Sequence, residues 1–452
     1  MKKLGLYVIA FSLLVACNPF NNELKLSTIN LRFSTDTIFF DTLLSSVTSV
    51  TKRLKVYNQE PKPITIDHIN LSNTSNAFSI TVNGIEGVAF NQIDLLAGDS
   101  LLILLKANLK EQNQELPFVV EEQLSFSTDV GEQVIPIIAW GQDAHFLRDS
   151  ILMCNTVWQA GKPYVIYDNV LIDSLCSLTI QPGTKIYSHF GSSIFVKGTL
   201  KALGNAHSPI LFTNDRFDSG FDTAPGQWGG VVFLEGSSSN SMEFTYIKNA
   251  KNGIWLGTPD TDTIPDLIIT NSIIENTSGS GILSFTSDLK MTNCLVNNCG
   301  EINVACLAGG NYSFVHNTFA NFGFGFFRSQ PIMVLTNNLQ LSDGSIILDN
   351  LTSTLENNII WGNQLDELVL VNSTDKVFDI TIKSNLIRTS DIQLDADNIL
   401  NQDPLFVEPS AYNYRIDSLS PAINKGNNWG ITIDLDSMQR DTNPDIGAYE
   451  WR

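Results

Sequence analysis

The sequence is poor in positive charge. Its 452 residues include 27 lysines and arginines against 47 aspartates and glutamates, which gives a net charge of −20 at neutral pH. A nucleic-acid-binding surface needs clustered basic residues, because the phosphate backbone dominates affinity. The charge balance therefore argues against nucleic acid, and against polyanionic ligands unless a local basic site exists.

Long hydrophobic runs are missing after the first sixteen residues, so no later segment is expected to span a bilayer. At the start, Lys2 and Lys3 precede the apolar run 4–16, which is typical of a secretory signal and too short for a spanning helix. The run ends in Leu-Val-Ala-Cys17, which resembles a bacterial lipobox. This resemblance implies cleavage before Cys17 and acylation of that cysteine, and several acyl chains on one residue give stable membrane anchoring.

We therefore expect a lipoprotein signal peptide at 1–16 and a lipid-anchored tether at 17–27. Asn18 rather than aspartate follows the cysteine, which is compatible with outer-membrane sorting, so the expected location is the cell envelope, most consistently the outer membrane. The alternative is an ordinary signal peptide that happens to end in a cysteine.

Cysteine patterns typical of zinc sites are also absent. No CxxC pair and no nearby histidine accompanies the five cysteines that follow Cys17. An odd number cannot all pair within the chain, and three of them lie inside repeated apolar phrases. We interpret them as buried free thiols: Cys154, Cys176, Cys294, Cys299 and Cys306.

Helical periodicity is missing from the second half, where one short phrase returns instead. Each phrase is a polar residue, usually asparagine, followed by a short apolar strand, and successive phrases start 27, 22, 23, 21, 20 and 27 positions apart. A fixed period in the low twenties, with asparagine, serine and glycine at the corners, predicts a β-solenoid. The phrases begin at Phe244, Asn271, Asn293, His316, Asn337, Asn357 and Ser384.

Residues 146–402 resemble a right-handed parallel β-helix of the pectin-lyase-like superfamily. The segments LTIQPGTKIY (178–187) and IFVKGTLKALG (194–204) are characteristic of the first coils of such proteins, with glycines where tight corners need permissive backbone. The tail 403–452, which ends DIGAYEWR, resembles the terminal segment of many bacterial β-helix proteins and is expected to cover the last open coil.

Residues 28–145 carry alternating strands separated by turn residues. Seven or eight short strands in this span predict an immunoglobulin-like sandwich, at 29–33, 37–40, 53–57, 64–69, 78–82, 100–107, 123–126 and 134–139. The expected fold is thus all-β: an N-terminal sandwich, then a right-handed parallel β-helix with a C-terminal cap. The whole layout resembles uncharacterised lipoproteins of Bacteroidota. This resemblance does not point to any particular activity.

An assembled catalytic set is not apparent in the repeats. A polysaccharide lyase needs a cation and a base near a uronate, and a glycoside hydrolase needs two or three neighbouring carboxylates. The exposed positions of the repeats are mostly asparagine, serine and threonine, with single acids between them. We therefore expect no catalytic residues and no metal site.

The long loop 214–230 is the candidate ligand site, because long loops on regular coils often carry function. Its aspartates are candidate Ca²⁺ ligands, its aromatics could stack on a sugar, and its arginine could orient a hydroxyl or carboxylate. The alternative is a loop packed on itself, with the arginine paired to one aspartate and the tryptophan covering the coil edge. The candidate residues are Asp215, Arg216, Asp218, Phe221, Asp222 and Trp228.

Nine Asp-Ser/Thr triplets followed by an apolar residue resemble the O-glycosylation acceptor of exported Bacteroidota proteins, whereas ordinary composition would give roughly two or three. The alternative is that these dipeptides simply begin turns. The candidate acceptors are Thr37, Thr42, Ser100, Ser150, Ser174, Thr223, Thr263, Ser418 and Ser437.

These features favour a non-catalytic envelope lipoprotein whose β-helix binds a polysaccharide or an envelope protein, with the membrane as partner through the lipid anchor. The alternative function is a polysaccharide lyase or glycoside hydrolase acting near the 214–230 loop.

Overall fold

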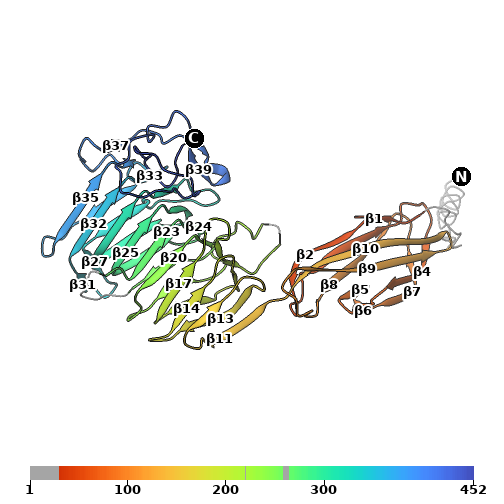
Figure 1. Ribbon diagram of the computed structural model, residues 1–452. Helices are drawn as coiled ribbons and strands as arrows, with labels where there is room; N and C mark the ends of the chain where they lie inside the picture. Colours follow the sequence, from red (N-terminus) through yellow and green to blue (C-terminus); the bar gives the residue numbers. More distant parts are fainter. Residues whose placement is uncertain (1–29, 219, 258–263, 452) are drawn as a thin grey trace, which may run out of the picture. The chain divides into compact units, whose positions relative to one another are not determined.

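The computed structural model describes residues 30–218, 220–257 and 264–451, and Figure 1 shows their course. Cys17, the signal peptide, the tether and Thr263 lie outside the described residues. Within the described residues, one single-turn 3-10 helix, η1 (Pro409–Ala411), accompanies the β-strands. The same part of the chain contains no helix long and apolar enough to cross a membrane. The chain divides into two compact units, one ending at Gln142 and the other beginning at Asp143, with residues 113–116 grouped with the second unit.

The first unit is a β-sandwich, as predicted. Strand interiors alternate buried and exposed residues, so Leu54, Ile66 and Phe126 are among the side chains that fill the space between the sheets. Strand β7 (Ala89–Leu95) was not predicted, because it is an edge strand whose side chains are mostly exposed and lack alternation. One sheet has the order β1 (Arg32–Phe33), β3 (Lys52–Tyr57), β8 (Ser100–Ala107), β5 (Phe78–Val82), β6 (Ile85–Gly87). The other has the order β2 (Ile38–Leu44), β10 (Gly131–Gln142), β9 (Phe118–Thr128), β4 (Ile64–Leu71), β7 (Ala89–Leu95).

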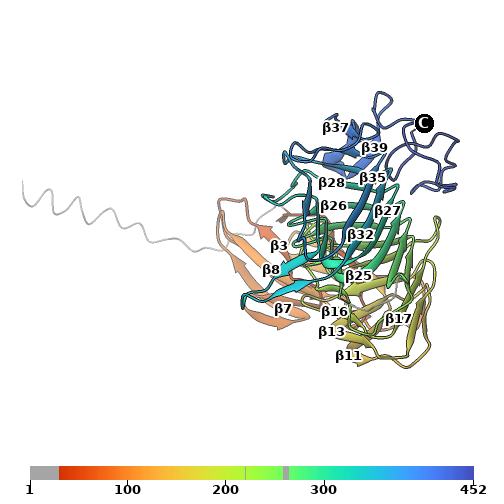
Figure 2. The ribbon, with the colours of Figure 1, turned by 90° about the vertical axis from the view of Figure 1, so that its left-hand side faces the viewer.

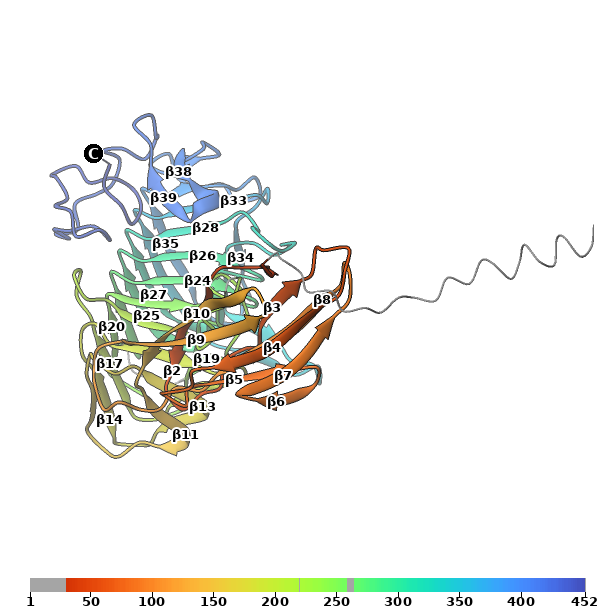
Figure 3. The ribbon, with the colours of Figure 1, turned by 90° about the vertical axis from the view of Figure 1, so that its right-hand side faces the viewer.

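The second unit is a parallel β-helix, in which parallel strands stack coil upon coil in three rows (Figures 2 and 3). The first row begins with the early halves of β11 (His145–Ile151) and β13 (Tyr164–Ile172). It continues with β15 (Lys185–Ser188), β18 (Ile210–Asn214), β21 (Thr245–Lys248), β24 (Ile273–Thr277), β26 (Leu295–Cys299), β28 (Thr318–Asn321), β33 (Ile359–Gly362), β36 (Leu386–Ile387) and β37 (Ile399–Leu400).

The second row begins with the later halves of β11 and β13 and includes the early halves of β25 (Ile282–Thr292) and β27 (Val304–Val315). Its other strands are β16 (Ser193–Val196), β19 (Gly230–Phe233), β22 (Ile254–Leu256), β29 (Met333–Thr336) and β34 (Leu368–Val371). The third row contains the later halves of β25 and β27. Its other strands are β12 (Thr156–Trp158), β14 (Ser177–Ile180), β17 (Thr199–Leu203), β20 (Asn240–Glu243), β23 (Leu267–Thr270), β32 (Leu351–Glu356) and β35 (Phe378–Lys383).

Asparagines occupy the corners, as the repeat indicated. Asn271, Asn293 and Asn357 have positive φ angles, a conformation that asparagine tolerates better than most residues. At a neighbouring corner, Asn317 donates to Asn358 and Asn358 donates to Asn385, each through the side-chain amide at 3.0 Å. These buried amides form a ladder with one asparagine per coil, which pairs polar groups that would otherwise be unsatisfied inside the coil stack.

One repeated phrase does not begin a coil. The phrase at Asn337 leads into β30 (Asn338–Gln340), which pairs antiparallel with β31 (Ile346–Leu348) in a hairpin. The first row therefore passes directly from β28 to β33, with Thr318 beside Ile359. Asparagine followed by apolar residues fits an exposed hairpin strand as well as a coil corner, so the phrase alone did not distinguish them.

Two of the five cysteines correct the prediction of free thiols. Cys154 and Cys176 form a disulfide between consecutive coils, with their Cα atoms 4.4 Å apart. The stacking of coils brings together residues 22 positions apart, which no local motif announces. Cys294, Cys299 and Cys306 are free and buried, as predicted.

The C-terminal segment packs along the side of the β-helix. Tyr414, Leu435 and Ala448 bury Leu295 and Ala320 on the outer side of the first row, and the Ala448 N–H donates to the Thr318 hydroxyl at 3.0 Å. The segment includes β38 (Phe406–Glu408) and β39 (Asn413–Ile416). The segment, which was expected to cover the last open coil, lies along the side of the first row and there also packs against Leu386 and Ile399 of the last strands. Ile392 and Leu394, which precede it, pack against the end of the main core.

Candidate functional site

The loop 214–230 packs largely on itself. The Arg216 side chain donates to the Asp218 carboxylate at 2.8 Å through Nε, and its guanidinium carbon lies 3.6 Å from the centre of the Phe221 ring. The loop is tied to the coils by Asn249, which donates to the main-chain oxygens of Phe221 and Asp222. The predicted arginine and phenylalanine thus contact each other.

Trp228 is not available to a ligand. Its side chain is 1 % exposed, and its indole N–H donates to the main-chain oxygen of Lys248 at 2.8 Å. The prediction that this ring stacks on a sugar is therefore wrong. The indole fills the core instead, as expected for a large aromatic whose single donor finds a buried acceptor.

The loop aspartates do not converge on a common point. Asp215 pairs with the Nδ1 atom of His189 at 2.7 Å, whereas Asp218 pairs with Arg216. Among the described residues, no group of three or more histidine, cysteine or acidic side chains is arranged to hold a metal ion. The described aspartates of the loop therefore do not supply the several converging oxygen ligands that a calcium site needs.

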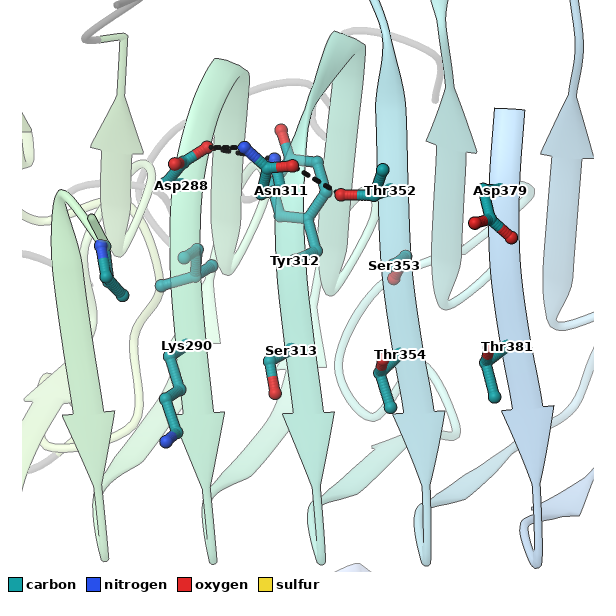
Figure 4. A pocket seen from close by; sticks show the side chains of 12 residues that line it. Asp288, Lys290, Asn311, Tyr312, Ser313, Thr352, Ser353, Thr354, Asp379 and Thr381 are labelled. Atoms are coloured by element: carbon teal, nitrogen blue, oxygen red, sulfur yellow. Dashed lines mark hydrogen bonds between the residues drawn. The ribbon is translucent and has the colours of Figure 1, made fainter. Parts of the chain in front are cut away.

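A polar groove of about 260 Å³ lies instead on the outer side of the third strand row. The strands that carry it are β25, β27, β32 and β35, and their register aligns one side chain per coil. Figure 4 shows two parallel lines of side chains, one from Asp288 to Asp379 and the other from Lys290 to Thr381. The groove is lined by Pro265, Asp288, Leu289, Lys290, Asn311, Tyr312, Ser313, Thr352, Ser353, Thr354, Asp379 and Thr381.

Hydrogen bonds across the coils fix the first of these lines. Asp288 accepts from the Asn311 side chain at 2.7 Å and from its main-chain N–H at 3.0 Å, and the Thr352 hydroxyl donates to the Asn311 side-chain oxygen. Asp266, one coil earlier, accepts the Asp288 N–H at 2.9 Å. The line is thus held in one arrangement by charge-assisted and amide hydrogen bonds.

The second line is less constrained and more open. Lys290, Ser313, Thr354 and Thr381 are neighbours in register, and all four are exposed or half-buried. Hydroxyl groups donate and accept, so this line can hydrogen-bond to a ligand rich in hydroxyls. Tyr312 belongs to the core, since its buried hydroxyl donates to the main-chain oxygen of Gly309 at 2.9 Å.

The carboxylates of the groove do not match a glycosidase pair. Asp288 and Asp379 are three coil steps apart, about 14 Å at the usual strand spacing, whereas such pairs are separated by about 5–9.5 Å. The closer acids, Asp266 and Asp288, are 2 % and 5 % exposed and accept main-chain N–H groups of the next coil. Their position fits a structural role better than proton transfer to a bound substrate.

The groove was not predicted from the sequence. Its members come from four strands spaced 23, 41 and 27 residues apart in register, so no local motif contains them. The one visible signal was the abundance of serine, threonine and asparagine at exposed repeat positions. Only the register of the coils shows which of those positions align.

Comparisons with known proteins bear on the fold alone. A family model described as a right-handed β-helix region matches residues 164–319, which supports the predicted right-handed β-helix. No curated protein matches the chain. The catalytic unit of an α-1,3-glucanase from Streptomyces thermodiastaticus is 14% identical, with 75% of each chain covered and a TM-score of 0.28.

Two further structures resemble parts of the chain. A family 123 glycoside hydrolase from Clostridium perfringens is 5% identical, with 26% of this chain and 30% of that chain covered and a TM-score of 0.19. A PapD-like domain of human CEP192 is 10% identical, with 25% of this chain and 84% of that chain covered and a TM-score of 0.18. The chain spans less than a third of the length of this hydrolase.

Proposed function

We propose that this protein is a lipid-anchored envelope protein whose β-helix binds a glycan in the groove on the third strand row, without catalysis. The groove carries the proposal, because its floor consists of hydroxyl, amide and single charged groups fixed at the coil spacing. An extended polysaccharide presents hydroxyls at a similar repeat along its length. A peptide would need apolar pockets or an unpaired strand edge, and the lining residues include few apolar side chains.

The non-catalytic part of the proposal is supported by the spacing of the groove carboxylates and by the separate pairing of the loop acids. A lyase at the 214–230 loop would need a bound cation and a base that converge on the substrate. Instead, Asp215 pairs with His189, and Arg216 pairs with Asp218. Incubation with uronate polymers, followed by absorbance near 235 nm, should show no unsaturated products. Product formation that survives mutation of the groove would favour the lyase alternative.

A bulky side chain on the groove floor tests the binding site. We expect Thr354→Tyr to abolish glycan binding by the mature protein, measured on a glycan array and by calorimetry, because the ring would fill the second line of the groove. Thr179→Tyr is the matched control, since Thr179 is a half-buried residue in the same strand row that does not line the groove. Equal loss in both variants, or no glycan bound by the wild-type protein, would contradict the proposal.

Export and anchoring are supported by the signal and lipobox residues at the N-terminus and by the disulfide between Cys154 and Cys176, a bond that persists in oxidising compartments. Metabolic labelling with a fatty acid should modify the wild-type protein and leave Cys17→Ser unlabelled. Labelling of both forms would remove Cys17 as the lipidation site.

We further propose O-glycosylation at the exposed acceptors Ser100, Ser174, Thr223 and Ser418. The Ser437 hydroxyl is buried, so this acceptor is excluded from the proposal. The competing interpretation has its own support, because Asp99 and Asp173 accept the N–H of the following serine, as in turns. An intact mass equal to polypeptide plus lipid would leave only the turn role.

A further inference from the structure

The two ends of the groove carry opposite charges. Lys290 extends from the β25 coil and Asp379 from the β35 coil, and both side chains are exposed (Figure 4). The strands are three coil steps apart, about 14 Å along the groove at the usual strand spacing. In the described part of the chain, none of the ion pairs involves Lys290 or Asp379.

The third charged residue that lines the groove, Asp288, already has hydrogen-bond partners within the protein. Asp288 is 5 % exposed and accepts two hydrogen bonds from Asn311, so it belongs to the fixed wall of the groove. Between Lys290 and Asp379 the floor offers the neutral hydroxyls of Ser313, Thr354 and Thr381. Among the described residues that line the groove, the charges open to a ligand are therefore one ammonium at one end and one carboxylate at the other.

We infer that the groove is selective for a zwitterionic glycan. A carboxylate on one sugar unit pairs with Lys290, and a free amino group two or three units further along pairs with Asp379. Each coil advances by about 4.8 Å, close to the length of one sugar unit, so the two charged sugars are bridged by units that contact the hydroxyl floor. This inference rests on the proposed glycan binding and specifies the class of glycan.

Charge complementarity excludes the simpler polymers. A polyuronate would place a second carboxylate against Asp379, and a polyamine sugar would place an ammonium against Lys290. Each like-charge contact opposes binding, while a neutral glycan leaves both charges without a partner. The zwitterion alone satisfies both ends of the groove. It also agrees with the net charge of −20, which disfavours a polyanion without a wider basic surface.

Matched oligosaccharides test this inference with the full mature chain. N-deacetylated heparosan hexasaccharides carry alternating carboxylates and amines, whereas their N-acetylated parents carry carboxylates alone. Chitosan and chitin hexasaccharides supply the cationic and neutral members. Calorimetry should show that the zwitterion binds at least about tenfold more tightly than any of the other three, as expected for two charge-assisted contacts.

Two substitutions divide the selectivity between the ends of the groove. Lys290→Gln should abolish the preference for the zwitterion over chitosan, and Asp379→Asn should abolish its preference over the N-acetylated parent. Lys201→Gln and Glu243→Gln are matched controls, because both residues are exposed on the same strand row and do not line the groove. Neither control should change the preference.

The outcomes separate this inference from the proposed function. Equal affinity for neutral and zwitterionic glycans, with binding still abolished by Thr354→Tyr, would overturn the charge selectivity and leave glycan binding intact. Binding of none of the four glycans, on the calorimeter or on a wider array, would remove both. Zwitterion selectivity that persists in Lys290→Gln and Asp379→Asn would also overturn the inference.

Discussion

At the scale of single residues, the asparagines do most to hold the coils in register. Asn358 is fully buried and connects three coils, because it accepts from Asn317, donates to Asn385 and donates to the Phe314 main-chain oxygen at 2.8 Å. The equivalent position holds asparagine in four successive late coils, at 317, 358, 385 and 398, and serine or cysteine in the two coils before them, at 272 and 294. The asparagines of the late repeats therefore form one hydrogen-bonded column.

Replacing Asn358 by alanine should lower the free energy of unfolding of the β-helix by about 2–3 kcal/mol, because the buried Asn317 main-chain N–H and the Phe314 main-chain oxygen lose the partners that the Asn358 side chain supplies. Urea unfolding followed by fluorescence would measure the change. Asn428→Ala is the control at an exposed asparagine of the same unit and should stay within about 0.5 kcal/mol of wild type. Similar losses in both variants would contradict the ladder's importance.

The repeat also explains how far the sequence could predict the structure. Apolar alternation and corner asparagines are local signals, so the sandwich, the β-helix and most of the coils were predictable. The hairpin β30–β31 and the disulfide were not, since each depends on which residues the coil lengths bring together. The groove could not be predicted for the same reason, because Asn311 and Thr352 are neighbours in register although 41 residues separate them in the sequence.

At the scale of elements, the disulfide and the C-terminal segment stabilise parts of the solenoid that have few contacts from coil stacking alone. The disulfide joins the turn before β12 to the turn before β14, at the end of the helix where coils have a neighbour on one side only. The C-terminal segment holds the outer side of the first row. Its contacts include Arg440, which donates to the Asn293 side chain at 3.0 Å and to Glu450 at 2.9 Å.

Removing the disulfide with Cys154→Ser and Cys176→Ser should cost about 3 kcal/mol, the value expected for closing a loop of this length. Hydrogen exchange should locate the loss in the first coils, β11 to β15. Cys299→Ser, which replaces a free cysteine in the middle of the solenoid, provides a comparison in which no cross-link is removed. Unchanged exchange in the first coils would show that the bond adds no stability there.

The C-terminal segment should also respond to pH through His316. Burial, together with the charge of Arg440, lowers the pKa of this histidine to about 3, and its Nε2 atom lies 2.8 Å from the Asn357 side chain. In the unfolded chain the pKa is near 6.5, so below that value the unfolded state takes up a proton that the folded state does not. The stability contributed by neutral His316 is present above pH 6.5 and is lost as the pH falls toward 3.

Nearby carboxyls act in the opposite direction. Burial raises the pKa of Asp434, Asp445 and Glu450, so these groups favour the folded state as the pH falls through their range. A comparison with His316→Gln isolates the histidine. Between pH 7 and pH 4.5 the wild type should lose about 2–3 kcal/mol more than the variant in urea unfolding, and equal losses would show that His316 is not held neutral.

At the scale of the whole molecule, the β-helix is sealed by the last part of the chain. Leu295, Ile359 and Leu386 on the first row are buried against residues of the C-terminal segment. The open groove lies on a different row, so the segment leaves it accessible while it covers an apolar surface. The three rows thus differ in what they present, although all are built from the same coils.

A chain that stops at residue 402 should bind a hydrophobic dye and self-associate, because it exposes the apolar side of the first row. Size-exclusion chromatography with light scattering and dye fluorescence would measure this. The double variant Tyr414→Ala, Ile446→Ala keeps the chain complete and should show the same effect in weaker form, with a lowered melting temperature. A monomeric truncated chain that binds no dye would contradict this role.

The packing of the C-terminal segment on the first row has a consequence for biosynthesis. Coils form between neighbouring segments, so the early part of the solenoid can fold while later residues are still being synthesised. The C-terminal segment cannot pack until synthesis is almost complete, because Asn271 donates to the main-chain oxygen of Asp434, 163 residues later. An interrupted chain therefore displays an apolar side that a finished chain hides. Proteases and chaperones that recognise exposed apolar surface would distinguish an incomplete chain from a complete one.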